Sequence, residues 1–173
     1  MIHELLSNPQ WLEPQINYLI WLQGIRETVG TTFDSFFLYI TKFGELLIPT
    51  IFMSIVYWCV DFEAGLYLFT LNSIGLFFAK IFKMAACVYR PWVLNSEVKP
   101  LEAALARSGG YSFPSGHCMM AATSWGGLAF LLRKKKIICT LIILFILLVA
   151  FSRNYVGVHT PQDVLCGIFI GLI

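Results

Sequence analysis

The stretch Tyr111-Ser112-Phe113-Pro114-Ser115-Gly116-His117 lies directly before a long apolar run of the sequence. It combines turn-forming residues with hydroxyl groups and a titratable imidazole, so we expect a loop that opens a helix. The first turn of a helix presents free backbone N–H groups and the positive end of the helix dipole, which together favour an anion. Taken alone, the segment Pro114–His117 is better interpreted as a loop-to-helix corner. A chemical role depends on what surrounds it.

The composition of the chain indicates an integral membrane protein. Of its 173 residues, 58% are hydrophobic and only 13% are charged, and the mean hydropathy is +0.74. Soluble domains rarely have such a composition, and the apolar residues come in long runs. The net charge of +2 gives no reason to expect a nucleic-acid partner. The five cysteines form no CxxC pair and are expected to be buried free thiols, and the three histidines predict no metal or other cofactor.

Hydropathy predicts an all-α transmembrane bundle of about five to six helices. Four apolar segments cover approximately residues 44–60, 62–82, 117–132 and 137–152, and a fifth begins at Pro161. A spanning helix needs roughly 17–25 residues, so the two later segments qualify only if charged side chains at their ends snorkel. A helix from Pro161 to Ile173 rises only about 20 Å, against a hydrocarbon core of about 30 Å. We therefore expect the last helix to be truncated.

Residues 1–43 are amphipathic rather than uniformly apolar, which separates them from an expected transmembrane core at 44–173. We expect Pro14 to open a first helix and Thr32 to cap a second. Two short helices lying in the membrane interface are the preferred interpretation, and one imperfect spanning helix is the alternative. The first ten residues lack a basic segment followed by an apolar core, so no cleavable signal peptide is expected. His3 is expected to be a surface residue.

The short loop Arg133–Lys136 carries four consecutive cations, which predicts a cytoplasmic position for this loop. Counting the spans from it places five residues together on the outward face: Lys83, Arg90, His117, Arg153 and His159. The three cations among them have few acidic neighbours, and an unpaired charge at membrane depth costs about 2.5–3.5 kcal/mol. Each cation alone is better interpreted as a helix-end side chain that snorkels than as a ligand. Together they indicate an anionic partner, and phosphate suits the planar fork of arginine.

The segment His159-Thr160-Pro161-Gln162-Asp163 begins the last apolar run. Thr160 is expected to be the helix N-cap, Pro161 the first helical residue, and Asp163 the acid that completes a capping box. An acid four residues after a histidine can also accept the Nδ1 proton of that histidine. Such a contact leaves Nε2 of His159 free as a nucleophile or a base. We expect the two roles of Asp163 to compete for one carboxylate.

Three motifs occur in order: Lys83-x6-Arg90-Pro91, Pro114-Ser115-Gly116-His117 and Ser152-Arg153-x5-His159-x3-Asp163. Their order and spacing resemble those of the type 2 phosphatidic acid phosphatase superfamily, which includes membrane lipid phosphatases, glucose-6-phosphatases and soluble vanadium haloperoxidases. The resemblance covers residues 83–163, and the apolar segments favour the membrane branch. It implies a helical core with the active site at the outer face of the cell membrane.

The resemblance also implies roles for the residues in these motifs. His159 would attack phosphorus and form a phosphohistidine, Asp163 would orient His159, and His117 would protonate the leaving oxygen and later activate water. The phosphate oxygens would be held by Lys83, Arg90, Ser115, Gly116 and Arg153. The implied function is metal-independent hydrolysis of a lipid phosphomonoester or diphosphate. Phosphoryl transfer to an acceptor alcohol and non-catalytic binding of a lipid phosphate are the alternatives, and the lipid and the oligomeric state stay open.

Overall fold

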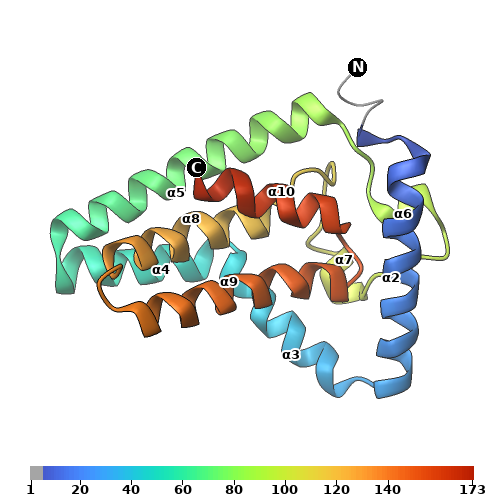
Figure 1. Cartoon of the computed structure of the whole chain (residues 1–173), viewed down its shortest axis with the longest axis horizontal. Helices are drawn as coiled ribbons and strands as arrows, with labels where there is room; N and C mark the ends of the chain where they lie inside the picture. The colour runs from blue at the N-terminus through green and yellow to red at the C-terminus, as the bar shows by residue number, and fades with distance from the viewer. Residues whose placement is uncertain (1–5) are drawn as a thin grey trace.

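The computed structural model describes residues 6–173, and the regular elements in this range are helices (Figure 1). Residues 1–5, among them His3, lie outside this range. In chain order the elements are α2 (Pro9–Val29), α3 (Thr32–Ile40), the 3₁₀ turn η1 (Thr41–Gly44), α4 (Leu47–Ile55), the π-helical turn η2 (Val56–Val60), α5 (Phe62–Ala86), α6 (Pro91–Leu94), α7 (Glu102–Leu105), α8 (Gly116–Leu131), α9 (Lys136–Tyr155) and α10 (Pro161–Leu172). The expected all-α class is confirmed.

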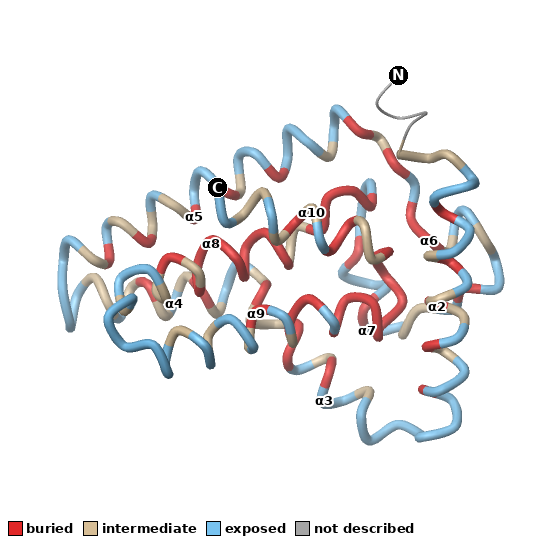
Figure 2. The backbone as a smooth tube through the Cα atoms, in the orientation of Figure 1, coloured by how far each residue is buried: buried red, intermediate tan, exposed pale blue. Residues whose placement is uncertain are grey.

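Helix α8 is the centre of the bundle, and α5, α9 and α10 pack around it (Figure 1). Every residue from 118 to 125 is buried, and Figure 2 shows that buried positions concentrate on α8 and on the adjacent end of α9. A helix that is apolar and buried on all sides must be surrounded by other elements. The motif Pro114–His117 therefore introduces the most enclosed helix of the molecule, which fixes the position of its first turn.

The outer helices expose their apolar side chains. The helical stretch from Phe62 to Leu94 and the helix Lys136–Tyr155 are long and apolar enough to cross a membrane, and the bent pair 32–44 and 47–60 becomes a third span if it is counted as one. Large apolar side chains face outward on α5, α9 and α10, among them Phe77, Phe78, Leu141, Leu144, Leu165 and Phe169. Lipid rather than water suits such surfaces.

The cysteines only partly follow the sequence-based expectation. Cys118 is buried, but Cys59 is exposed on η2, and Cys87, Cys139 and Cys166 are half-buried. All five are free thiols. The expectation that the thiols are buried is therefore wrong for Cys59, because η2 turns this apolar position to the outside of the bundle.

Helix α2 crosses one end of the bundle and is not among the helices that are apolar enough to span (Figure 1). It begins at Pro9 and continues through Pro14, so the expected start at Pro14 is wrong. Asn8 is the N-cap, its side chain accepts a hydrogen bond from the Gln10 backbone N–H, and Pro9 fills the first helical position. Thr32 is likewise the first residue of α3 rather than its cap.

The buried side chain of Arg26 ties α2 to the rest of the molecule. Its guanidinium donates to the carbonyl oxygens of Tyr155, at 3.3 Å, and Lys99, at 2.8 Å. The carbonyls at the end of a helix lack intrahelical partners, so a cation stabilises the end of α9 there. An apolar cluster of Leu22, Phe37, Ala104, Tyr155, Val156 and Val158 surrounds this contact. These interactions immobilise the loop that follows α9 and carries His159.

Helix α10 approaches α8 closely at Gly167, where a Cβ atom would lie 2.6 Å from the Ser115 carbonyl oxygen. We expect Gly167→Ala to lower the melting temperature of the protein in detergent, because overpacking costs about 1–3 kcal/mol. The matched control is Gly24→Ala in α2, where nothing lies within 4 Å of an added Cβ atom. Alanine in place of this glycine favours the helix. Equal melting temperatures for the two variants would contradict the close approach of α8 and α10.

Candidate active site

A cavity of about 180 Å³ lies where the α7–α8 connection meets the ends of the long helices, and its wall is rich in charge. It is lined by Lys83, Arg90, Arg107, Ser108, Gly109, Gly116, His117, Arg153 and His159. The structure thus brings together most of the residues that the motifs singled out, whereas Ser115 and Asp163 are buried behind the wall. The basic loop Arg133–Lys136 lies at the opposite end of the bundle (Figure 1).

The side chains around this cavity come mostly from helix ends. Lys83 lies in the last turn of α5, and Arg153 lies in the last turn of α9. His117 is in the first turn of α8, two residues after its N-cap Ser115, and His159 immediately precedes Thr160, the N-cap of α10. The four helices therefore present their charged or titratable ends to one point, while their apolar middles face other helices or the outside.

Arg90 fixes the tautomer of His159. Its guanidinium donates to the carbonyl oxygens of Gly109, Gly110 and Val158, each at 3.0 Å, and its Nη1 lies 3.0 Å from Nε2 of His159. A guanidinium has no acceptor, so Nε2 must accept this hydrogen bond. The proton of the neutral ring is then on Nδ1, and the lone pair on Nε2 lies on the side of the cation.

Asp163 lies on the other side of the His159 ring and is fully buried. Its Oδ2 is 3.4 Å from His159 Nδ1, and it accepts hydrogen bonds from the Ser112 hydroxyl at 2.6 Å and the Thr160 backbone N–H at 2.9 Å. The expected capping box is confirmed, with Thr160 as the N-cap. Both roles of Asp163 fall on the same oxygen, Oδ2, whereas Oδ1 is buried without a hydrogen-bond partner.

The environment keeps His159, in the loop between α9 and α10, in its neutral form. Burial lowers the pKa of His159 well below its usual value, and the positive charges of Arg90, Arg153 and Lys83 lower it further. A neutral imidazole retains the lone pair that a nucleophile needs. A bond from Nε2 to an electrophile would create positive charge on the ring, and Asp163 is placed to stabilise that charge.

The three cations of the motifs are held by neutral groups. Arg153 donates to the hydroxyls of Thr41, at 2.6 Å, and Ser108, at 3.5 Å, and its Nε is buried without a hydrogen bond. Lys83 donates to the carbonyl oxygen of Tyr111 at 2.7 Å. Within residues 6–173, no carboxylate lies within ion-pair distance of Lys83, Arg90 or Arg153. The cavity wall therefore carries positive charge that an anion would compensate.

The sequence motifs did not identify four of the residues that support this site. Ser112 lies in the stretch before α8 but had no assigned role, and Asn154 Nδ2 donates to the His159 carbonyl oxygen at 2.9 Å. Arg107 lines the cavity from the loop after α7, and Glu45 contacts both Arg107 and His117. Arg107 and Glu45 are far from the motifs in sequence, so only the folded chain identifies them. In the described range, no group of three or more His, Cys, Asp or Glu residues could hold a metal ion.

Comparison with known proteins agrees with this arrangement. The family model described as PAP2 superfamily matches residues 64–173. The chain is 32% identical over 121 residues to phosphatidylglycerophosphatase B of Bacillus subtilis (strain 168), which covers 64% of this chain and 59% of that protein. It is 44% identical over 61 residues to undecaprenyl-diphosphatase of Sulfolobus acidocaldarius, which covers 35% of this chain and 29% of that protein. The matched regions thus span less than two thirds of either relative.

The fold also matches a solved structure over nearly the whole chain. The crystal structure of a transmembrane PAP2 type phosphatidylglycerolphosphate phosphatase from Bacillus subtilis superposes with a TM-score of 0.78 at 23% sequence identity. The match covers 99% of this chain and 85% of that chain. At this level of identity the match supports the transmembrane helical fold, and it leaves the chemistry to be argued from the site.

We expect inorganic phosphate to bind in the cavity and to raise the melting temperature of the purified protein. Lys83→Met should weaken this binding roughly 10-fold, because a hydrogen bond to a charged group contributes about 1.5–3 kcal/mol. Lys80→Met is the matched control, since Lys80 is exposed one turn earlier on the same helix. Isothermal titration in detergent measures both affinities. Equal affinities for the two variants would show that Lys83 does not contact the anion.

Proposed function

The chain belongs to the PAP2 superfamily, and we propose that it is a membrane phosphatase that hydrolyses a phosphorylated lipid in the cavity between His117 and His159. One observation carries the proposal. Three cations without a carboxylate partner among the described residues surround a space that is lined by two histidines. Simple anion binding needs only the cations, whereas a neutral histidine held between Arg90 and Asp163 is the arrangement of a nucleophile.

In the first step of the proposed reaction, Nε2 of His159 attacks phosphorus. Arg90 moves its hydrogen bond from Nε2 to a phosphate oxygen, which frees the lone pair. A bond forms between Nε2 and phosphorus while the bond from phosphorus to the leaving oxygen breaks, and His117 gives a proton to that oxygen. Asp163 stabilises the positive charge on the phosphorylated ring. The product of this step is a phosphohistidine and a free lipid alcohol, or a lipid monophosphate if the substrate is a diphosphate.

In the second step, water replaces the histidine on phosphorus. The neutral His117 takes a proton from the attacking water, the new oxygen–phosphorus bond forms, and the bond to Nε2 breaks. Lys83, Arg90 and Arg153 balance the charge on the equatorial oxygens, assisted by the Ser115 hydroxyl and the Gly116 backbone N–H. The Ser115 hydroxyl is buried without a hydrogen bond, so it has a donor to offer. Because fixed cations neutralise the phosphate, we propose that the reaction needs no metal ion.

The position of the cavity supports a lipid substrate and an outward-facing site. The cavity lies at the end of an apolar bundle, where a headgroup at the membrane surface can enter while its hydrocarbon chain stays in the bilayer. The basic loop Arg133–Lys136 marks the opposite end, and such loops stay in the cytoplasm. We therefore propose that the protein spans the cell membrane with its active site on the outer side. The matched relatives are a phosphatidylglycerophosphatase and an undecaprenyl-diphosphatase, so the test includes a lipid monophosphate and a lipid diphosphate.

Purified protein in detergent should release inorganic phosphate from at least one of these lipids, with and without a chelator. His159→Gln should lower the rate by roughly 10⁴-fold or more, because removal of a nucleophile has effects of this size. Asp163→Asn should lower it by about 10²–10⁴-fold, since the imidazole loses the carboxylate that orients it. His3→Gln is the histidine control and should retain the activity.

Three outcomes would change the proposal. Full activity of His159→Gln would show that another group attacks phosphorus. Transfer of the phosphoryl group to added glycerol in place of water would identify a phosphotransferase. Lipid binding that survives in His159→Gln, together with no phosphate release by the parent protein, would indicate a non-catalytic lipid-binding protein.

A further inference from the structure

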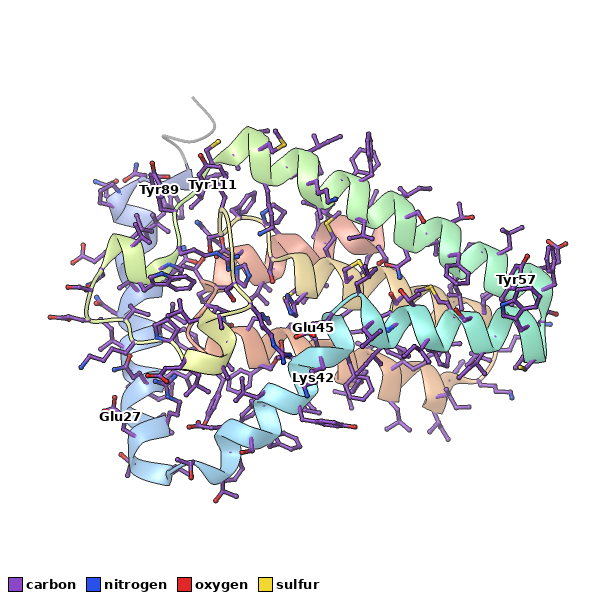
Figure 3. The ribbon with its side chains drawn as sticks, turned by 180° about the vertical axis from the view of Figure 1, so that it is seen from behind. Glu27, Lys42, Glu45, Tyr57, Tyr89 and Tyr111 are labelled. Carbon is purple, nitrogen blue, oxygen red and sulfur yellow. The ribbon has the colours of Figure 1, made fainter. Side chains whose placement is uncertain are left out.

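A second contact between a histidine and a carboxylate joins His117 to Glu45. Oε1 of Glu45 lies 3.7 Å from Nε2 of His117 and 3.4 Å from Nη1 of Arg107. All three motifs leave Glu45 out. Figure 3 shows Glu45 at the bend where the chain passes from η1 to α4. The distance to His117 is an ion-pair contact rather than a hydrogen bond, and Nε2 of His117 is buried without a hydrogen-bond partner.

The fold places this carboxylate against the first turn of α8. The helical pair 32–44 and 47–60 bends by 55° at the break that contains Glu45. Gly44 allows the close approach, because a Cβ atom there would lie 2.5 Å from the His117 carbonyl oxygen and 3.1 Å from the His117 Cβ. The Trp125 indole N–H donates to the Phe43 carbonyl oxygen at 3.0 Å and ties the break to α8. The contact between Glu45 and His117 is therefore built by the packing of two helices.

The sequence around Glu45 makes its charge conspicuous. Glu45 is the only charged residue between Lys42 and Asp61, in a stretch that is otherwise apolar. A charged side chain in such a segment is costly unless it has a partner or a function. The Arg107 side chain is 60% exposed, and an exposed ion pair contributes little to stability. The contact with Arg107 therefore does not explain an acid in this apolar segment. The contact with His117 is the better reason for an acid at this position.

The charges around His117 show what the acid contributes. A general acid must carry its proton before the bond to the leaving group breaks. Arg90, Arg107, Arg153 and Lys83 line the same cavity, as does His159. Burial of His117, together with the positive charges of Arg153 and Arg90, opposes protonation of the ring. Among the described residues, the carboxylate that lies within ion-pair distance of His117 is that of Glu45, in the η1–α4 break. It favours the imidazolium form.

We propose that Glu45 is a positioning residue that favours the protonated form of His117 and orients the ring for its role as general acid, a role that rests on the proposed function. Glu45 stays ionised throughout the reaction, assisted by Arg107. With Nε2–H directed at Glu45, Nδ1 is the nitrogen that gives its proton to the leaving oxygen as the phosphorus–oxygen bond breaks. His117 is then neutral, and Nδ1 takes a proton from the attacking water in the second step, which restores the imidazolium.

Glu45→Gln with two substrates tests this role. One substrate is the lipid alkyl phosphate that the parent protein hydrolyses, and the other is an aryl phosphate whose leaving group departs without a proton. Hydrolysis of the alkyl ester should fall about 10- to 100-fold, part of the roughly 10²–10⁴-fold that a positioned acid–base group contributes. Hydrolysis of the aryl ester should change little, which also shows that the variant is folded. Glu63→Gln, an exposed acid at the start of α5, is the control and should leave both rates unchanged.

The pH profile of kcat/KM gives a second readout. Loss of the Glu45 negative charge makes the His117 proton easier to remove, so the high-pH limb for the alkyl ester should move to lower pH in Glu45→Gln. An equal fall for both esters would overturn the proposal, because it would show a structural role for Glu45. Unchanged rates and an unchanged profile would overturn it as well. A parent protein that releases no phosphate from either ester would overturn the proposed function and the role of Glu45 together, whereas the other two results leave the proposed function standing.

Discussion

Positive charge that has no carboxylate partner within residues 6–173, enclosed at one end of an apolar bundle, is the constraint on which the architecture depends. Burying such charge is costly, and this molecule offsets the cost with neutral dipoles instead of acids. Backbone carbonyls surround the Arg90 guanidinium, and hydroxyl groups meet Arg153. These partners satisfy hydrogen bonds without cancelling the charge, so the positive potential stays available to a ligand. A carboxylate in the same place would stabilise the cation and occupy the site with its own negative charge.

Loops carry most of these neutral partners, and helix ends supply the geometry. The chain places the end of α9 between α2 and α3, where Arg26 and an apolar cluster hold it, and it continues directly into the loop that carries His159. Because residues 118–125 of α8 are all buried, the first turn of this helix cannot shift without disturbing the helices packed around it. The catalytic geometry in the proposed mechanism is thus fixed by packing some distance away, and Gly44 and Gly167 are two places where other elements pack closely against α8.

The sequence predicted the parts of this structure that depend on local signals. The apolar runs located the long helices, and Thr160, Pro161 and Asp163 predicted the start of α10, because caps and runs are properties of neighbouring residues. The start of α2 was missed because Asn8 and Pro9 form a stronger helix start than Pro14. Glu45 and Arg107 could not be found from spacing. Their place in the site depends on a bend in one helix pair and on a long connection, and neither feature leaves a periodic pattern.

The two histidines of the cavity show how one residue type is prepared for two tasks. His159 is 1% exposed and lies between a cation at Nε2 and a carboxylate at Nδ1, so burial and charge both favour a neutral ring with its lone pair on the side of the cation. His117 lies at a helix start, where its side chain is 20% exposed and the Glu45 carboxylate lies on the side of Nε2. The carboxylates thus face different nitrogens of the two rings. In the proposed mechanism, the acid that faces Nδ1 of His159 prepares a nucleophile and the acid that faces Nε2 of His117 prepares a proton donor, so the two roles follow from which elements supply the carboxylates.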